Sequence, residues 1–219
     1  MLLPQSLAAV LNPGYNPCAH FTGACKGLTW NPERGFVPRG YFGAPRLISD
    51  IELVIVLAEP SNPVPGENHS WIAGCADVAS AMAERMTQSI LSRNSAFSRN
   101  LAFILECCWT PLDLEAAIQR TWITESVLCS AEYPCAPVLS AATCTSNYLI
   151  QQLHLFPAAF LVALGRKAQG RLRSLGYDAA YAPSPAKPSG NWHSSKHAWE
   201  QLGTLFQQER KRASIKIIN

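Results

Sequence analysis

The stretch Glu52-Leu-Val-Ile-Val-Leu-Ala58 decides the expected fold, because it is a nearly unbroken run of aliphatic residues. A strand with one solvated face would alternate apolar and polar residues. This run instead predicts a strand buried on both faces, as in the middle of a parallel sheet. It continues into Glu59-Pro-Ser-Asn-Pro-Val-Pro-Gly66, whose three prolines disfavour both helix and strand pairing, so a rigid loop is expected directly after the strand.

Helical and strand-like segments alternate around this strand. Helices are expected at residues 73–93, 140–153, 166–175 and 195–208, and at 111–119 with Thr110 as N-cap. Strands are expected at 122–128 and 158–164, and a strand or buried turn at 100–108. Residues 177–190 are expected to form a loop, and residues 1–45 loops with short helices. This order predicts one α/β domain over residues 1–219, a three-layer, doubly wound, mainly parallel central sheet with helices on both faces. Such sheets bind ligands beyond the carboxyl ends of their strands, which here means the loops 59–71, 124–129 and 181–193.

Composition indicates a globular chain with a sizeable core, since 48% of its residues are hydrophobic. The longest apolar runs, residues 51–58 and 156–164, are too short to span a bilayer, so no membrane partner is expected. The first residues carry no basic segment and reach Pro4 at once, unlike a signal peptide. We therefore expect a cytoplasmic protein, and we expect it to be a monomer.

Charge is unevenly distributed along the chain. Residues 1–159 carry 8 basic and 12 acidic side chains, a net −4, whereas residues 160–219 carry 10 and 3, a net +7. A polyanion such as nucleic acid would therefore be attracted to the C-terminal quarter. A solvated basic tail at residues 209–219 explains part of this excess, but basic residues also precede the tail, from Arg166 onward.

Eight cysteines are many for a reducing compartment, and without export they are not expected to form disulfides. They are then buried thiols, zinc ligands or ligands of an iron–sulfur cluster. Three lie in apolar or helix-like stretches and are interpreted as core: Cys75, Cys107 and Cys108. Five lie near loop-forming residues and are the ligand candidates: Cys18, Cys25, Cys129, Cys135 and Cys144.

Several motifs, in this order, resemble those of the uracil-DNA glycosylases, most of all the iron–sulfur families 4 and 5. Val54-Ile-Val-Leu-Ala-Glu59-Pro-Ser-Asn62 is similar to an apolar strand running into the family's Gly-Glu-Ala-Pro-Gly loop, and Ser70-Trp71-Ile72 occupies the place of its stacking aromatic residue. Further along the chain, four stretches resemble the family's later motifs in the same order. They are Thr124-Glu125-Ser-Val-Leu-Cys129, Cys144, Pro157-Ala-Ala-Phe-Leu-Val-Ala-Leu-Gly165-Arg-Lys-Ala168 and Ala182-Pro183-Ser184-Pro185.

The chain also departs from the family pattern. Glu125 stands where the family reads uracil with an Asn, and Ala182 stands where the DNA-binding loop carries a His. Pro60 takes the place of a water-activating Asp or Asn of other families, and Cys18 and Cys25 are more widely spaced than the usual pair. The chain is therefore expected to be a divergent member.

The resemblance implies a DNA glycosylase that extrudes uracil from DNA and hydrolyses its N-glycosidic bond, which initiates base excision repair. It implies a catalytic role for Glu59, an anion beside the developing sugar cation, and we expect Asn62 to orient water or the base. Trp71 would stack on uracil, or alternatively pack in the core. Glu125, Asn68 and His69 would bind the base, and a structural ion pair is the alternative role for Glu125. The DNA-binding residues would be Ser184, Pro185, Lys187, Asn191, His193 and Lys196, with His193 also a possible donor to the base.

The resemblance further implies a structural [4Fe–4S] cluster bound by Cys18, Cys25, Cys129 and Cys144, with Cys135 as a possible substitute. Zinc is the alternative, because four thiolates also suit that ion.

Two other functions stay open. One is a non-catalytic binder of uracil-containing or damaged DNA; the other, a small-molecule enzyme on the same fold, is disfavoured by the basic C-terminal quarter.

Overall fold

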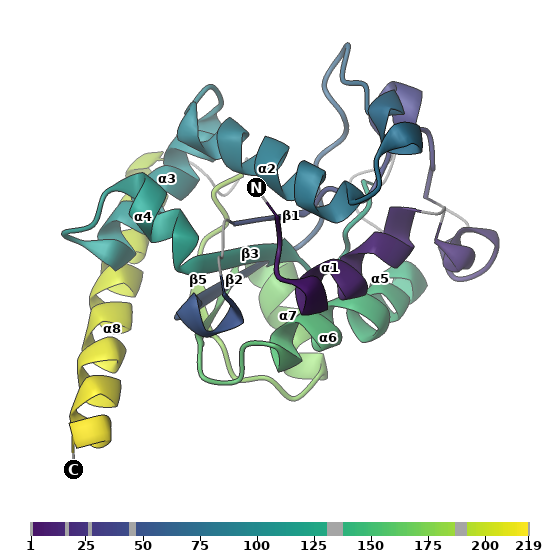
Figure 1. Ribbon diagram of the computed structural model, residues 1–219. Helices are drawn as coiled ribbons and strands as arrows, with labels where there is room; N and C mark the ends of the chain where they lie inside the picture. Colours follow the sequence, from purple (N-terminus) through teal and green to yellow (C-terminus); the bar gives the residue numbers. More distant parts are fainter. Residues whose placement is uncertain are drawn as a thin grey trace.

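A computed structural model describes residues 2–15, 18–25, 28–43, 47–130, 138–186 and 192–218 (Figure 1). Its five-stranded sheet has the order β1-β3-β2-β4-β5, with only β1 antiparallel to its neighbour. The strands are β1 (Tyr41–Phe42), β2 (Leu53–Leu57), β3 (Thr121–Glu125), β4 (Phe160–Leu164) and β5 (Ala180–Ala182). The expected mainly parallel α/β sheet is thereby confirmed.

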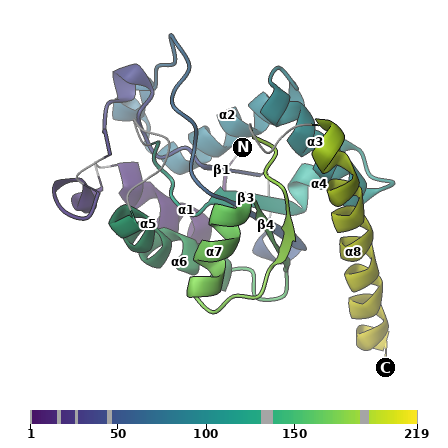
Figure 2. The ribbon, with the colours of Figure 1, turned by 180° about the vertical axis from the view of Figure 1, so that it is seen from behind.

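Helices pack on both faces of the sheet, which makes three layers (Figures 1 and 2). They are α1 (Gln5–Leu11), α2 (Val78–Leu91), α3 (Ala96–Trp109), α4 (Leu114–Gln119), α5 (Val138–Cys144), α6 (Ile150–His154), α7 (Arg166–Ser174) and α8 (Trp192–Ile218). A π-helical turn, Thr145–Leu149, joins α5 to α6, and a 3₁₀ turn, Ser70–Gly74, precedes α2.

The aliphatic run forms β2, the middle strand, and all five of its residues are buried. Successive side chains of a strand point to opposite faces. Leu53, Ile55 and Leu57 accordingly pack against α3, α4 and α8, whereas Val54 and Val56 belong to the core beneath α1, α6, α7 and the first turns of α2. One strand therefore supports both hydrophobic layers.

Residues 100–108 lie in α3, so the expectation of a strand or buried turn there is wrong. Ser95 begins the helix, since its Oγ accepts a hydrogen bond from the Ser98 N–H at 3.0 Å. The buried positions Leu101, Ile104, Leu105 and Cys108 recur at three- to four-residue spacing. This helical period is hard to distinguish from a buried strand when only a short apolar window is considered.

Three smaller expectations also need correction. Thr110 follows the end of α3, and the N-cap of the next helix is Asp113, whose Oδ1 accepts from the Ala116 N–H at 2.8 Å. The expected loop 177–190 contains the short edge strand β5. Helix α8 is much longer than 195–208 and extends away from the rest of the protein, so residues 209–218 of the basic tail are helical (Figures 1 and 2).

No helix within the described part of the chain combines the length and the apolar character that crossing a bilayer requires.

The central position of β2 yields a stability prediction. Ile55 is fully buried, so Ile55→Ala should lower the free energy of unfolding by about 2–5 kcal/mol through lost burial and a new cavity. Leu47→Ala removes the same kind of side chain from a site that is 60% exposed and should cost far less. Urea unfolding measures both, and equal losses would contradict the assignment of β2 as the structural centre.

Candidate functional site

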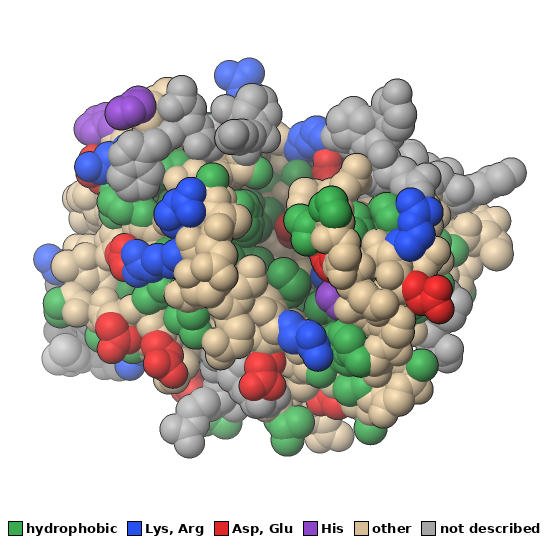
Figure 3. Space-filling model, turned by 90° about the horizontal axis from the view of Figure 1, so that it is seen from above, with side chains coloured by type: hydrophobic (Ala, Val, Ile, Leu, Met, Phe, Trp, Pro, Cys, Tyr) green, Lys and Arg blue, Asp and Glu red, His purple; other side chains and the backbone are tan. Residues whose placement is uncertain are grey.

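The expected site lies beyond the carboxyl ends of β2 and β3. Leu57 is in register with Glu125, and Glu59 follows two residues later, so chain geometry brings the two acidic side chains to one place. The loop after β2 rises at the top of Figure 1, and Figure 3 views the molecule from that side. A hollow lies near the middle of this face, with hydrophobic side chains at its floor and charged side chains of both signs around it.

Glu59 is held by two cations of α7. Its Oε1 lies 2.6 Å from Lys167 Nζ and its Oε2 lies 2.7 Å from Arg171 Nη1, and only 10% of its side chain is exposed. Arg171 also donates to the Ala58 carbonyl at 2.7 Å and to Ser126 Oγ at 2.8 Å. Arg171 thereby ties the ends of β2 and β3 together, and the negative field of Glu59 is partly neutralised.

Glu125 is buried at the end of β3, and its N–H donates to the Gly40 carbonyl at 2.6 Å. A side chain at position 40 would collide with Glu125, because a Cβ there would lie 2.9 Å from Glu125 Cβ. Burial raises the pKa of Glu125 well above its ordinary value, and the nearby charge of Glu59 raises it further. Among the described residues, Glu125 Oε2 has no hydrogen-bond partner.

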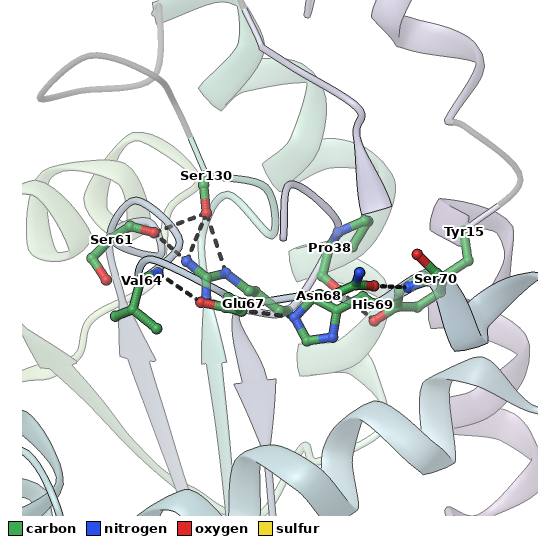
Figure 4. A network of polar contacts seen from close by, with 10 residues as sticks. Tyr15, Pro38, Ser61, Val64, Glu67, Asn68, His69, Ser70 and Ser130 are labelled. Carbon is green, nitrogen blue, oxygen red and sulfur yellow. Dashed lines mark hydrogen bonds and ion pairs between the residues drawn. The ribbon is translucent and has the colours of Figure 1, made fainter. Parts of the chain in front are cut away.

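A buried network around Arg39 fixes the loop after β2 (Figure 4). The Arg39 guanidinium pairs with Glu67, donates to the Ser61 carbonyl, and donates to Ser130 Oγ at 3.2 Å. Ser130 Oγ in turn donates to the same Ser61 carbonyl at 2.9 Å. Arg39 thus joins the loop after β2 to the segment after β3.

Glu67 links Arg39 to His69, whose Nε2 lies 2.9 Å from Glu67 Oε1. Burial alone would raise the pKa of Glu67, but the hydrogen bonds from His69 and the Val64 N–H and the charge of Arg39 lower it overall. His69 is buried, and its Nδ1 has no hydrogen-bond partner within the described part of the chain. It therefore lies within the polar network and not on the exposed surface of the loop.

The other expected base-contacting residues differ in their surroundings. Asn68 is exposed, and its Oδ1 accepts from the Ser70 N–H at 2.7 Å, which closes a local turn. Asn62 is exposed on the loop. Trp71 is half-buried against the core, and the Arg85 guanidinium lies over its ring at 4.5 Å from the centroid. Arg85 occupies one face of the Trp71 ring, so a stacked base would have to use the other.

The expected DNA-binding residues are only partly grouped. Ser184 is half-buried beside Gly165, at the start of α7, whereas Pro185 is buried and its carbonyl accepts from Asn100 Nδ2 at 2.9 Å. Its role as a surface contact is therefore limited to its backbone. His193 is exposed on α8, and Lys196 lies 3.7 Å from Glu200, one helical turn away. Lys187 and Asn191 lie outside the described residues.

Four of the five candidate cysteines come together. The cavity between the N-terminal segment, the end of β3 and α5 is lined by Cys18, Cys25, Cys129 and Cys144, with apolar and aromatic side chains around them. All four are buried. Burial raises the pKa of Cys129, and the neighbouring thiols of the other three raise it further, which reflects their proximity. Cys135 lies outside the described residues.

Hydrogen-bond donors surround this centre. Tyr148 Oη donates to Cys18 Sγ at 3.3 Å, and the Leu128 N–H donates to Cys144 Sγ at 3.4 Å. Bonds of this kind stabilise thiolate ligands. Across the described ranges, no three His, Cys, Asp or Glu side chains are grouped closely enough to hold a metal ion as they stand. The four thiols share one cavity, but as they stand they are not grouped closely enough to hold a single metal ion.

Sequence reasoning missed Arg39 and Ser130. No motif marks Arg39, and its partners Glu67 and Ser130 are 28 and 91 positions away in the chain. Only its neighbour Gly40 gives a local signal, since glycine is the one residue that fits against Glu125.

Comparisons with known proteins gave no relative: no family model matches the chain, and no curated protein matches it.

The Arg39 network predicts a stability effect. Arg39→Met should lower the free energy of unfolding by about 3 kcal/mol, because it leaves the half-buried Glu67 without its cation and the Ser61 carbonyl without one of its donors. Arg34→Met, at an exposed position nearby, is the matched control and should change little. Urea unfolding compares the two variants. If Arg39→Met lowers the free energy of unfolding by no more than the control does, the Arg39 network does not stabilise the fold.

Proposed function

We propose that this chain is a DNA glycosylase of the uracil-DNA glycosylase type, which hydrolyses the N-glycosidic bond of an extruded uracil and so initiates base excision repair. The observation that carries the proposal is the gathering of Cys18, Cys25, Cys129 and Cys144 around one cavity. They are the four residues that the resemblance implies as ligands, and they come from three separate segments, although Cys18 and Cys25 are more widely spaced than the family's usual pair. In this proposal the partner is uracil-containing DNA, and the protein acts as a cytoplasmic monomer.

The acidic end of the sheet supports the same reaction. Cleavage of this bond builds positive charge on the sugar and negative charge on the departing base, so a fixed anion near the sugar favours it. Glu59 is such an anion at the carboxyl end of β2. Hydrolysis would then need a water on the far side of the sugar from the base, for which the exposed amide of Asn62 is the available positioning group.

The DNA backbone would lie along the start of α7. Arg166 and Lys167 are exposed there, and Ser184 packs against the adjacent Gly165. Cationic side chains and a helix N-terminus both favour phosphate. The exposed His193 at the beginning of α8 would extend this surface.

We propose that Cys18, Cys25, Cys129 and Cys144 hold a [4Fe–4S] cluster, with zinc as the alternative. Four buried thiols and the donors of Tyr148 and Leu128 suit either group. The bound group would pin the N-terminal segment to the segment after β3. Ser130, which bonds Arg39, follows directly after Cys129, so this attachment would also steady the loop that carries Asn62.

A non-catalytic binder of uracil-containing DNA is the second candidate. The observation that favours it is the double ion pair of Glu59, because Lys167 and Arg171 weaken the field that a sugar cation would feel. Release of uracil decides between the two functions. A catalyst leaves an abasic site that alkali cleaves, whereas a binder holds uracil-containing DNA more tightly than thymine-containing DNA and leaves it intact.

The catalytic role of Glu59 is tested by Glu59→Gln, which keeps the shape of the side chain and removes its charge. The single-turnover rate of uracil excision should fall roughly 10²–10³-fold, the effect of losing one preorganised electrostatic group. Glu33→Gln, at an exposed glutamate, should leave the rate unchanged. Full activity in Glu59→Gln would mean that the catalytic charge lies elsewhere.

The cysteine centre is tested by metal analysis. The protein purified without oxygen should be brown and contain about four irons and four sulfides per chain. Cys129→Ala should lose most of the iron, whereas Cys75→Ala, a half-buried cysteine outside the cavity lining, should retain it. One zinc per chain would favour the alternative, and a protein with neither metal would contradict a metal centre.

A further inference from the structure

The carboxyl group of Glu125 is buried and forms no ion pair with any residue that the structure describes. It is 8% exposed at the end of β3, and its Oε2 has no hydrogen-bond partner among the described residues. Within the same part of the chain it forms no ion pair, whereas the two neighbouring acids do: Glu59 pairs with Lys167 and Arg171, and Glu67 pairs with Arg39.

The charges that face Glu125 come from three elements. Glu59 follows β2, Arg39 precedes β1, and Arg171 belongs to α7. Burial raises the pKa of Glu125, the charge of Glu59 raises it further, and the two arginines oppose this shift without cancelling it. Because each of these arginines already pairs with another carboxylate, Arg39 with Glu67 and Arg171 with Glu59, their charges would compensate an ionised Glu125 only in part.

The Glu125 side chain is also held in place. Gly40 lies directly against it, and Pro60 flanks the same point, since a Cβ at position 40 would be 3.0 Å from Glu125 Cγ and 3.0 Å from Pro60 Cγ. These contacts confine the Cβ and Cγ atoms of Glu125, and its carboxyl group lies at the carboxyl end of the sheet, close enough to Glu59 to feel its charge.

We propose that Glu125 is a neutral carboxylic acid and that it reads the hydrogen-bonding edge of the extruded base. This inference rests on the proposed function. A neutral carboxyl group presents an O–H donor beside a C=O acceptor. Uracil presents the complement, the N3–H beside O4, so the two form a pair of parallel hydrogen bonds.

Ionisation of Glu125 would end this recognition. A carboxylate only accepts hydrogen bonds, so it would lose the bond to O4 and place its negative charge against that oxygen. The neutral acid pairs equally with an amino group beside a ring nitrogen, as in cytosine. Glu125 therefore makes recognition depend on one proton, while the choice between uracil and cytosine comes from other contacts.

The activity test compares pH profiles of uracil excision. The wild-type rate should fall by about tenfold per pH unit once the pH exceeds the pKa of Glu125, because each turnover needs its proton. Glu125→Gln keeps a donor beside an acceptor at every pH and should remain active where the wild type has lost activity. Glu115→Gln, at an exposed position on α4, should follow the wild-type profile. Parallel profiles of wild type and Glu125→Gln, or no activity of Glu125→Gln at any pH, overturn the reading role.

A second measurement does not depend on activity. If Glu125 is neutral when folded, the folded protein binds one more proton than the unfolded chain above the unfolded pKa, about 4.3. Wild-type stability should then fall relative to Glu125→Gln as the pH rises from that value to the folded pKa, and the difference should level off above it. The infrared band of a protonated carboxyl group at neutral pH should vanish in the same variant.

These results separate the inference from the proposed function. A stability difference that does not change with pH, with no infrared band, overturns the neutral acid even if uracil is excised. A pH-dependent difference without uracil release at any pH leaves the acid neutral but overturns the glycosylase, and with it the reading of a base.

Discussion

Burial of β2 on both faces is the constraint on which the rest of the structure depends. Its side chains belong to both hydrophobic cores, so the helices of each layer are positioned relative to one strand. The prolines that follow end the strand and place Glu59 at the carboxyl end of the sheet. The alignment of β3 beside β2 then brings Glu125 to the same end of the sheet. The acidic site is therefore a consequence of strand register.

Two arginines stabilise the carboxyl end of the sheet. Arg171 bonds the ends of β2 and β3 from α7, and Arg39 bonds the loops that follow the same strands. Both use a guanidinium group, whose several donors suit carbonyl, hydroxyl and carboxylate partners at once. Arg39 is connected through Ser130 to the segment that carries Cys129. The cysteine cavity and the Arg39 network are therefore neighbours along the chain.

The sequence allowed the sheet and its central strand to be predicted, and local signals also marked five cysteines as ligand candidates. The grouping of four of them was expected only from the resemblance, and those four line one cavity. The aliphatic run of β2 is unambiguous, and the cysteines stand near loop-forming residues. The expectation of a strand or buried turn at residues 100–108 is wrong because this segment of α3 is too uniformly apolar to show the helical period in a short window. Arg39 and the cations of Glu59 carry no local signal, because Arg39 and Glu67 are 28 positions apart and Lys167 and Glu59 are 108 positions apart, and contacts over such separations leave no pattern in the chain.

The most direct test is a crystal structure of the protein with a DNA duplex that contains a non-cleavable uracil nucleotide. In this complex the base should be extruded to the end of β2 and β3, with its N3–H and O4 facing Glu125, its sugar near Glu59 and its phosphates along the start of α7. DNA bound on another face, or a base that remains stacked in the duplex, would contradict the proposed function.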